Sequence, residues 1–249
     1  MTKLGRLRHS IHNFVIDTRR LVGMFSRLDR DVVSTVYLKG TGIEIGALHN
    51  PLRVPSGITV RYVDQMPAAE LRKQYPEMAS YTLVDPDIVD NGETLGTIAD
   101  GSQDFVIANH FIEHCEDPIG AVMNMVRVLR KDGVLFLCIP DKRFTFDNER
   151  PVTPLEHLVR DHDEGPAWSR SEHFREWVRC VEHIQDDVKA EARVRHLIET
   201  KYSIHYHVWS EMEVMEFVLM LGKRFKLPVD LEVLLKSNGE IVVILSRAA

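Results

Sequence analysis

The sequence is poor in cysteine and has no long apolar run. Its 249 residues include three cysteines, Cys115, Cys138 and Cys180, which are widely spaced and form no C-x-x-C pair. This pattern argues against a disulfide scaffold or a cysteine-based zinc site, and it favours reduced thiols. No apolar stretch approaches the roughly 18–20 residues that span a bilayer, and no secretory signal is apparent. We therefore expect a cytoplasmic protein.

The charge is unevenly distributed along the chain. The formal net charge is −6, yet residues 1–30 contain seven Lys and Arg against Asp17 and Asp29, a balance of +5. A basic arm on an acidic body could contact an anionic membrane surface or a protein partner, although an ordinary amphipathic helix packed on the body has the same pattern. An acidic body without a basic-aromatic stripe predicts no nucleic-acid partner. The sequence does not indicate an oligomeric state.

Residues 41–146 alternate short apolar runs with helical stretches, which is typical of a parallel α/β sheet. The expected strands are residues 42–45, 60–63, 88–89, 104–108 and 134–139. Apolar residues at helical spacing predict a helix from Ile119 to Leu129 between the last two strands. The chain closes with two strand-like runs, 228–235 and 241–245, around a Ser-Asn-Gly-Glu turn.

Residues 147–202 differ in composition from the rest of the chain. They are rich in charge and histidine, and Pro151, Pro154 and the pair Gly165-Pro166 interrupt them. In their later half, apolar residues from Phe174 to Val188 recur at helical spacing. We interpret 147–202 as a helical cap inserted into a domain that spans 39–249, with 1–38 forming an N-terminal helical arm.

Residues 42–47, Gly-Ile-Glu-Ile-Gly-Ala, have the pattern of a short buried strand that ends in a loop at Gly46. Gly46 allows a sharp turn and lets a ligand approach the backbone closely. Glu44 is unusual, because a carboxylate in an apolar strand is costly unless it meets a donor or a cation. It is either paired internally or directed at a ligand.

The most specific segment is 104–118, Asp-Phe-Val-Ile-Ala-Asn-His-Phe-Ile-Glu-His-Cys-Glu-Asp-Pro. It resembles the fourth-strand signature of class I S-adenosylmethionine-dependent methyltransferases, in particular the small-molecule and polysaccharide group with an "EH..DP" sequence. Residues 127–135, Arg-Val-Leu-Arg-Lys-Asp-Gly-Val-Leu, are similar to that family's RVLKPGG passage from helix to strand. The resemblance covers about 39–146 and, in the order of its elements, 203–249.

The resemblance implies a doubly wound α/β fold with a mostly parallel seven-stranded sheet whose last strand is antiparallel. It also implies S-adenosylmethionine as cofactor and S-adenosylhomocysteine as product. The positions that match its cofactor motifs are Glu44, Gly46, Ala47, Asp64, Gln65, Asp90, Asn91, Gly92, Asn109 and His110. Asp64 would accept hydrogen bonds from both ribose hydroxyls, since one carboxylate offers two acceptors. Gly46-Ala47-Leu48 departs from the family's usual GxG loop.

Methyl transfer to a hydroxyl group requires a base, and histidine is a natural candidate near neutral pH. The candidate catalytic residues are His110, His205, His207, His157 and Asp147. His205 and His207 would point the same way if residues 203–208 are extended. The chain lacks the Asn-Pro-Pro-Tyr type of sequence found in amino-group methyltransferases of nucleic acids. We therefore expect O-methylation of a sugar, a polysaccharide or a similar polar metabolite.

Residues 110–114 also read H-x-x-E-H, a metalloprotease pattern. The segment begins directly after a strand, whereas a zinc hydrolase places both histidines on one helix. A divalent ion at His110, Glu113 and His114 is an alternative, and hydrogen bonding of Glu113 and His114 within the turn is the other. We favour the second, since magnesium prefers carboxylate oxygens to imidazole.

Two other functions stay open from the sequence. One is a methyltransferase-shaped protein without activity that serves as a binding or scaffold protein. The other is a nucleotide-dependent oxidoreductase, which the missing G-x-G-x-x-G after the first strand disfavours.

Overall fold

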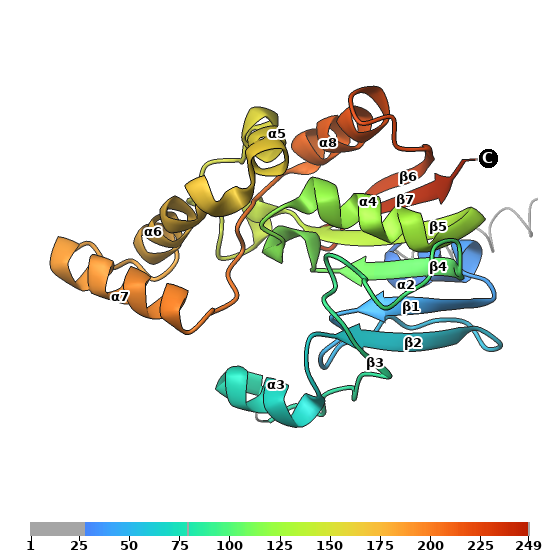
Figure 1. The fold of residues 1–249 in the computed structure, drawn as a ribbon, viewed down its shortest axis with the longest axis horizontal. Coiled ribbons are helices and arrows are strands. Elements are labelled where there is room, and N and C mark those ends of the chain that lie inside the picture. Colours follow the sequence, from blue (N-terminus) through green and yellow to red (C-terminus); the bar gives the residue numbers. More distant parts are fainter. Residues whose placement is uncertain (1–27, 79, 249) are drawn as a thin grey trace, which may run out of the picture.

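The computed structural model describes residues 28–78 and 80–248, and its centre is a seven-stranded sheet with helices on both faces (Figure 1). The strands are β1 (Thr41–Ile45), β2 (Thr59–Asp64), β3 (Ile88–Val89), β4 (Gln103–Asn109), β5 (Leu129–Pro140), β6 (Val229–Ser237) and β7 (Glu240–Arg247). Their order is β3-β2-β1-β4-β5-β7-β6. Strands β1 to β5 pair in parallel, and β7 runs antiparallel to β5 and β6. The predicted fold class is confirmed.

The central strands are rich in buried apolar residues, as expected where helices cover both faces of the sheet. In β4, Phe105, Val106 and Ile107 are all fully buried. Val106 packs in the hydrophobic core on one face of the sheet, and Phe105 and Ile107 pack in the core on the other face. Helix α4 (Pro118–Val128) covers one face, and its N-cap Asp117 accepts a hydrogen bond of 2.9 Å from the Gly120 amide. These cores fix the carboxyl ends of the strands, where the candidate site lies.

Helix α2 (Arg30–Tyr37) packs on the opposite face of the sheet. Its Val33 side chain and the adjacent Leu38 are buried in the core that contains Phe105 and Phe136. The end of the predicted arm is thus packed on the sheet. Residues 1–27, which hold most of the arm's basic charge, lie outside the described residues, so its suggested membrane or protein contact remains a prediction.

Three helices follow β5: α5 (Leu155–Glu164), α6 (Arg170–Cys180) and α7 (Asp187–Glu199). Helices α6 and α7 share a small core that includes Phe174 and Leu197, and Figure 1 shows them extending beyond the carboxyl ends of β1 and β4. Helix α5 instead packs against α4 and α8, with Leu158 fully buried in the main core. The cap that protrudes from the domain is therefore the α6–α7 pair.

The helical spacing from Phe174 to Val188 extends over two helices rather than one. Helix α6 ends at Cys180, and α7 begins after Asp186, whose carboxylate caps it by accepting a hydrogen bond of 2.9 Å from the Lys189 amide. Val188 is 80% exposed, so its place in the apolar pattern is coincidental.

The remaining helices are α3 (Ala68–Gln74) and α8 (Glu211–Lys223), with short 3₁₀ turns at Pro76–Met78, Ile112–His114, Lys142–Phe144 and Pro166–Trp168. Helix α8 begins with a capping box, in which the Glu213 carboxylate accepts a hydrogen bond of 2.9 Å from the Ser210 amide. Over the described part of the chain, every helix is too short or too polar to cross a membrane.

Candidate active site

A cavity of about 920 Å³ lies at the carboxyl ends of the parallel strands, between the sheet and the cap. Gly46, Asp64 and His110, which follow or end β1, β2 and β4, line one part of it. Trp177 and His205, from the cap and from the segment after it, line another part. In open α/β sheets, ligands bind at this edge. The cavity therefore brings six of the ten predicted cofactor residues together with the cap.

Two glycines shape the sheet side of the cavity in different ways. Gly46 has a φ of +65°, and a Cβ there would have only the Phe111 ring nearby, at 3.5 Å, so its backbone is open to a ligand. At Gly92, a Cβ would lie 2.5 Å from the Ile45 side chain and 2.6 Å from the Phe111 ring. Glycine at position 92 is needed for packing, whereas glycine at position 46 permits the turn and the open backbone.

Asp64, at the end of β2, presents a carboxylate to the cavity. Its Oδ1 accepts a hydrogen bond of 2.7 Å from the Gln65 amide, and both residues line the cavity. Burial raises the pKa of Asp64 to about 6, and the Gln65 amide partly offsets this effect. A partly desolvated carboxylate at a strand end fits a ligand that donates hydrogen bonds, such as the vicinal hydroxyls of a ribose.

In the loop after β3, one predicted residue stabilises the loop and two others line the cavity. Oδ2 of Asp90 accepts hydrogen bonds from the amide and hydroxyl of Thr97, at 2.8 and 2.7 Å, and Asp90 does not line the cavity. The neighbouring Asn91 and Gly92 do line it. Asp90 thus holds the loop in place, while the two residues that follow face the ligand space.

Three other predicted cofactor residues, Glu44, Ala47 and Asn109, do not line the cavity. Glu44 lies on the sheet face of Ile107, where its Oε1 accepts a hydrogen bond of 2.9 Å from the Leu52 amide. Its Oε2 is buried and has no hydrogen-bond partner within the described residues, and burial raises its pKa to about 7. Of the two alternatives for Glu44, the structure shows an internal hydrogen bond.

His205 and Asp147 form a buried pair in the cavity wall. Nδ1 of His205 lies 2.7 Å from Oδ2 of Asp147, and the buried Arg150 guanidinium donates both to Oδ1 of Asp147 and to the backbone oxygen of His205, each at 2.8 Å. Burial opposes ionisation of Asp147, but its hydrogen bonds with His205 and Arg150 lower its pKa. An ionised carboxylate here can accept a hydrogen bond from an Nδ1 proton, and in that tautomer of the imidazole Nε2 is the proton-accepting nitrogen.

His110 also lines the cavity, but its ring is hydrogen-bonded to the carboxylate of Glu240. Nε2 of His110 lies 2.7 Å from Oε1 of Glu240. Burial opposes a charge on His110, yet the hydrogen bond to Glu240 and the charges of Glu113 and Glu240 raise its pKa. A histidine that holds its proton in this way is a poor base.

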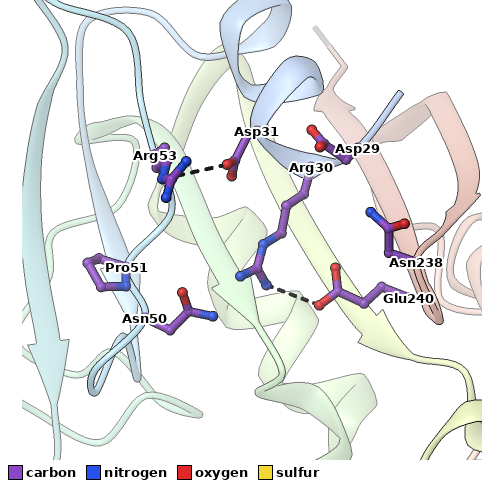
Figure 2. A pocket seen from close by; sticks show the side chains of 8 residues that line it. All are labelled: Asp29, Arg30, Asp31, Asn50, Pro51, Arg53, Asn238 and Glu240. Carbon is purple, nitrogen blue, oxygen red and sulfur yellow. Dashed lines mark hydrogen bonds and ion pairs between the residues drawn. The ribbon is translucent and has the colours of Figure 1, made fainter. Parts of the chain in front are cut away.

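Glu240 also lines a second, smaller hollow of about 360 Å³. Figure 2 shows Arg30 reaching from α2 to Glu240, at 3.2 Å, and Arg53 near Asp31. Two ion pairs thus occupy this hollow, and the third carboxylate in its lining, Asp29, accepts a hydrogen bond of 3.0 Å from the Val32 amide.

His207 and His157 lie away from the cavity. His207 is fully buried, with its ring 5.8 Å from that of His157. The expectation that His205 and His207 face one site does not hold. The backbone oxygen of Glu113 accepts hydrogen bonds from the amides of Tyr206 and His207, at 2.7 and 3.3 Å, and residues 203–208 do not form a regular strand.

The H-x-x-E-H residues lie on a 3₁₀ turn rather than on a helix. Nδ1 of His114 donates to the Ile204 carbonyl at 2.9 Å, and burial lowers the His114 pKa to about 3. The carboxylate of Glu113 is buried without a hydrogen-bond partner in the part of the chain described. One carboxylate oxygen of Glu113, one ring nitrogen of His114 and one of His205 lie within 4.8 Å of one another. A cation at this place would therefore be bound by His205, and not by the predicted His110, together with Glu113 and His114.

Several residues that line the cavity were not predicted as site residues from the sequence. Burial, with the charges of Glu116 and Asp117, raises the pKa of Glu93 to about 7. Glu116 forms an ion pair with Arg170, whose Nη2 lies 2.7 Å from Oε2. The cap side adds the aromatic residues Phe146, Phe174, Trp177, Tyr202 and Tyr206. Of these, Phe174 and Trp177 have helical spacing in the sequence, which is the same pattern as in an ordinary core.

Comparison with known proteins supports the fold and the activity class. Residues 40–137 match a family model described as a methyltransferase domain. No curated protein matches the sequence. A Rhodobacter sphaeroides structure described under Zn-dependent alcohol dehydrogenases is 16% identical, with a TM-score of 0.52 and coverage of 90% of this chain and 91% of that chain. At this identity the similarity shows a shared fold only.

Two further similar structures are S-adenosylmethionine-dependent methyltransferases. One, from Thermotoga maritima, is 17% identical with a TM-score of 0.45 and covers 96% of this chain and 99% of that chain. The other, from Aquifex aeolicus, is 10% identical with a TM-score of 0.41 and covers 83% and 80%. The matched residues 40–137 span β1 to most of β5, so this part of the seven-stranded sheet is similar to a methyltransferase domain.

Proposed function

We propose that the enzyme methylates a hydroxyl group of a sugar, a polysaccharide or a similar polar metabolite, with His205 as the general base. The observation that carries this proposal is the His205–Asp147 pair in the wall of the cavity that Gly46 and Asp64 also line. One cavity thus offers a cofactor end and an acceptor end.

At the cofactor end, Asp64 would accept the ribose hydroxyls, and the open backbone at Gly46 would contact the amino-acid part of the cofactor. Asn91 and Gly92 would border the adenine. S-adenosylmethionine, when bound, supplies an electrophilic methyl group on a sulfonium. The fit rests on the carboxylate of Asp64, which faces the cavity, and on the open space at Gly46.

At the acceptor end, the reacting hydroxyl must lose a proton as its oxygen attacks the methyl carbon. Nε2 of His205 would take this proton, because Asp147 holds Nδ1 as the donor. Arg150 keeps Asp147 ionised and fastens the backbone of His205. Asp147 and Arg150 are positioning residues, since they act through His205.

The acceptor end combines aromatic faces with charged groups. Phe146 and Trp177 lie against His205, with ring centroids 4.8 and 6.2 Å away. Glu93 and the Glu116–Arg170 pair supply polar groups on the same cavity. A sugar presents apolar C–H faces and a ring of hydroxyls, so aromatic faces bordered by carboxylates and a guanidinium suit it.

The test is transfer of a labelled methyl group from S-adenosylmethionine to a panel of sugars, polysaccharide fragments and amines, with mass spectrometry of the products. We expect methyl ethers from wild type and almost none from His205→Asn. Methylamine products alone, or full turnover by His205→Asn, would overturn the proposal. Binding of S-adenosylhomocysteine without any transfer would favour the binding or scaffold function.

A further inference from the structure

Four side chains with metal-binding groups converge outside the cavity. His157 and Asp161 lie one turn apart on α5, His173 lies on α6, and His207 lies on the segment that leads to α8. Each residue offers one ligand atom, and these atoms lie within 4.8 Å of one another. None of the four lines the cavity.

Three of the separations between the ligand atoms are close to those of a tetrahedral metal site. Nε2 of His157 lies 3.0 Å from Nε2 of His173 and 3.2 Å from Oδ2 of Asp161. Nε2 of His207 lies 3.7 Å from the same Oδ2. A tetrahedral zinc site with bonds of about 2.0–2.1 Å has ligand atoms about 3.3–3.4 Å apart. The three measured separations lie on both sides of that value.

The protein satisfies one of these ligand atoms poorly. Oδ2 of Asp161 is buried and has no hydrogen-bond partner among the residues described, and the ring nitrogen nearest to it is Nε2 of His157, at 3.2 Å. The other Asp161 oxygen accepts a hydrogen bond of 2.7 Å from the Ser169 hydroxyl, which orients the carboxylate. Nε2 of His207 has one further polar neighbour, the Glu116 carbonyl at 3.4 Å. Buried polar atoms without partners are rare in native proteins unless an ion or a water satisfies them.

We propose that His157, Asp161, His173 and His207 bind one Zn²⁺ ion. Three imidazoles and one carboxylate suit zinc, and four protein ligands leave no open position, so the ion is structural. It would fasten cap helix α6 to α5 and to the segment that carries His205, two residues before His207. The site lies outside the cavity, and this proposal does not depend on the identity of the acceptor.

The first test is the metal content of the purified protein and a Co²⁺ titration after zinc has been removed with a chelator. We expect about one zinc per chain and the visible absorption bands of four-coordinate Co²⁺ without a thiolate charge-transfer band. Zn²⁺ should displace the Co²⁺ and raise the melting temperature of the metal-free protein. A wild-type protein that binds neither ion, its histidines sharing protons instead, would overturn the proposal.

Variants locate the ion. Asp161→Ala and His173→Gln should weaken Co²⁺ binding more than about 100-fold, beyond the 10–100-fold loss typical of outer-sphere partners. His114→Gln, from the separate group with Glu113 and His205, and His196→Gln, exposed on α7, should leave it unchanged. Circular dichroism checks that each variant folds. Retained binding in His173→Gln, or its loss in His114→Gln, would contradict the assignment.

Discussion

Nδ1 of His205 and Oδ2 of Asp147 lie 2.7 Å apart although 58 positions separate the two residues in the sequence. The contact joins the loop after β5 to the segment that leaves the cap, and the buried Arg150 binds both partners. The candidate base is therefore held by groups from both ends of the inserted helices. Its orientation depends on how the cap is folded.

Removal of the imidazole at position 205 should separate chemistry from cofactor binding. We expect His205→Asn to lower kcat about 10²–10⁴-fold, the usual contribution of a general base. Asp147→Asn should lower kcat less and shift its pH profile, because the imidazole remains but loses its fixed tautomer. The affinity for S-adenosylhomocysteine, measured by calorimetry, should stay the same in both variants. Loss of this affinity together with kcat would show that the pair is structural, and His196→Gln is the control.

Cofactor binding should weaken at acidic pH. Burial raises the pKa of Asp64 to about 6, so its carboxylate is protonated as the pH falls through that value and loses acceptor capacity. Calorimetric titrations of S-adenosylhomocysteine between pH 5 and pH 8 should show the affinity falling below about pH 6. Asp64→Asn should bind more weakly and without this dependence. Parallel curves for both proteins would rule out Asp64 as the titrating group.

Glu44 should make the protein less stable at alkaline pH. Its pKa is 4.5 in an unfolded chain and about 7 in the folded protein, so folding favours the protonated form. The favourable contribution is complete below pH 4.5 and is lost as the pH rises through about 7, an effect of about 3 kcal/mol. Glu44→Gln keeps an acceptor for the Leu52 amide. In urea denaturation it should match wild type near pH 4 and exceed its stability near pH 8, and an identical pH dependence would refute this.

The cap aromatics should act on the acceptor rather than on the cofactor. Phe146 is 54% exposed and contacts His205, whereas Phe144 is 66% exposed and does not line the cavity. Phe146→Ala should raise the KM for the acceptor about 2- to 10-fold, in line with the ~0.5–1.5 kcal/mol of an aromatic contact. Phe144→Ala is the matched control. Equal effects of the two substitutions on KM would exclude a specific contact at Phe146.

Much of the sheet could be predicted from the sequence. Strands β1 and β2 are short runs that stop at Gly46 and Asp64, so their positions follow from the local pattern. Asp64 was recognisable because it directly ends an apolar run. The start of β5 was predicted wrongly. The strand begins at Leu129, which pairs with Gln103, five residues before the predicted start at Val134.

The cap side of the site could not be predicted, because tertiary contacts determine it. Alternation suggested that His205 and His207 share a face, but the backbone oxygen of Glu113 turns this segment, so that the two rings face different groups. Trp177 has the spacing of an ordinary helical core residue, and nothing local indicates that it borders a cavity.

The most direct test of the central claim is a calorimetric titration of S-adenosylhomocysteine into wild type and Asp64→Ala. We expect one site per chain in wild type and binding at least about 100-fold weaker in the variant, since hydrogen bonds to a charged group contribute about 1.5–3 kcal/mol each. Circular dichroism should show the same fold for both proteins. Absence of binding to folded wild type, or equal affinity in the variant, would contradict the assignment of this cavity to the cofactor.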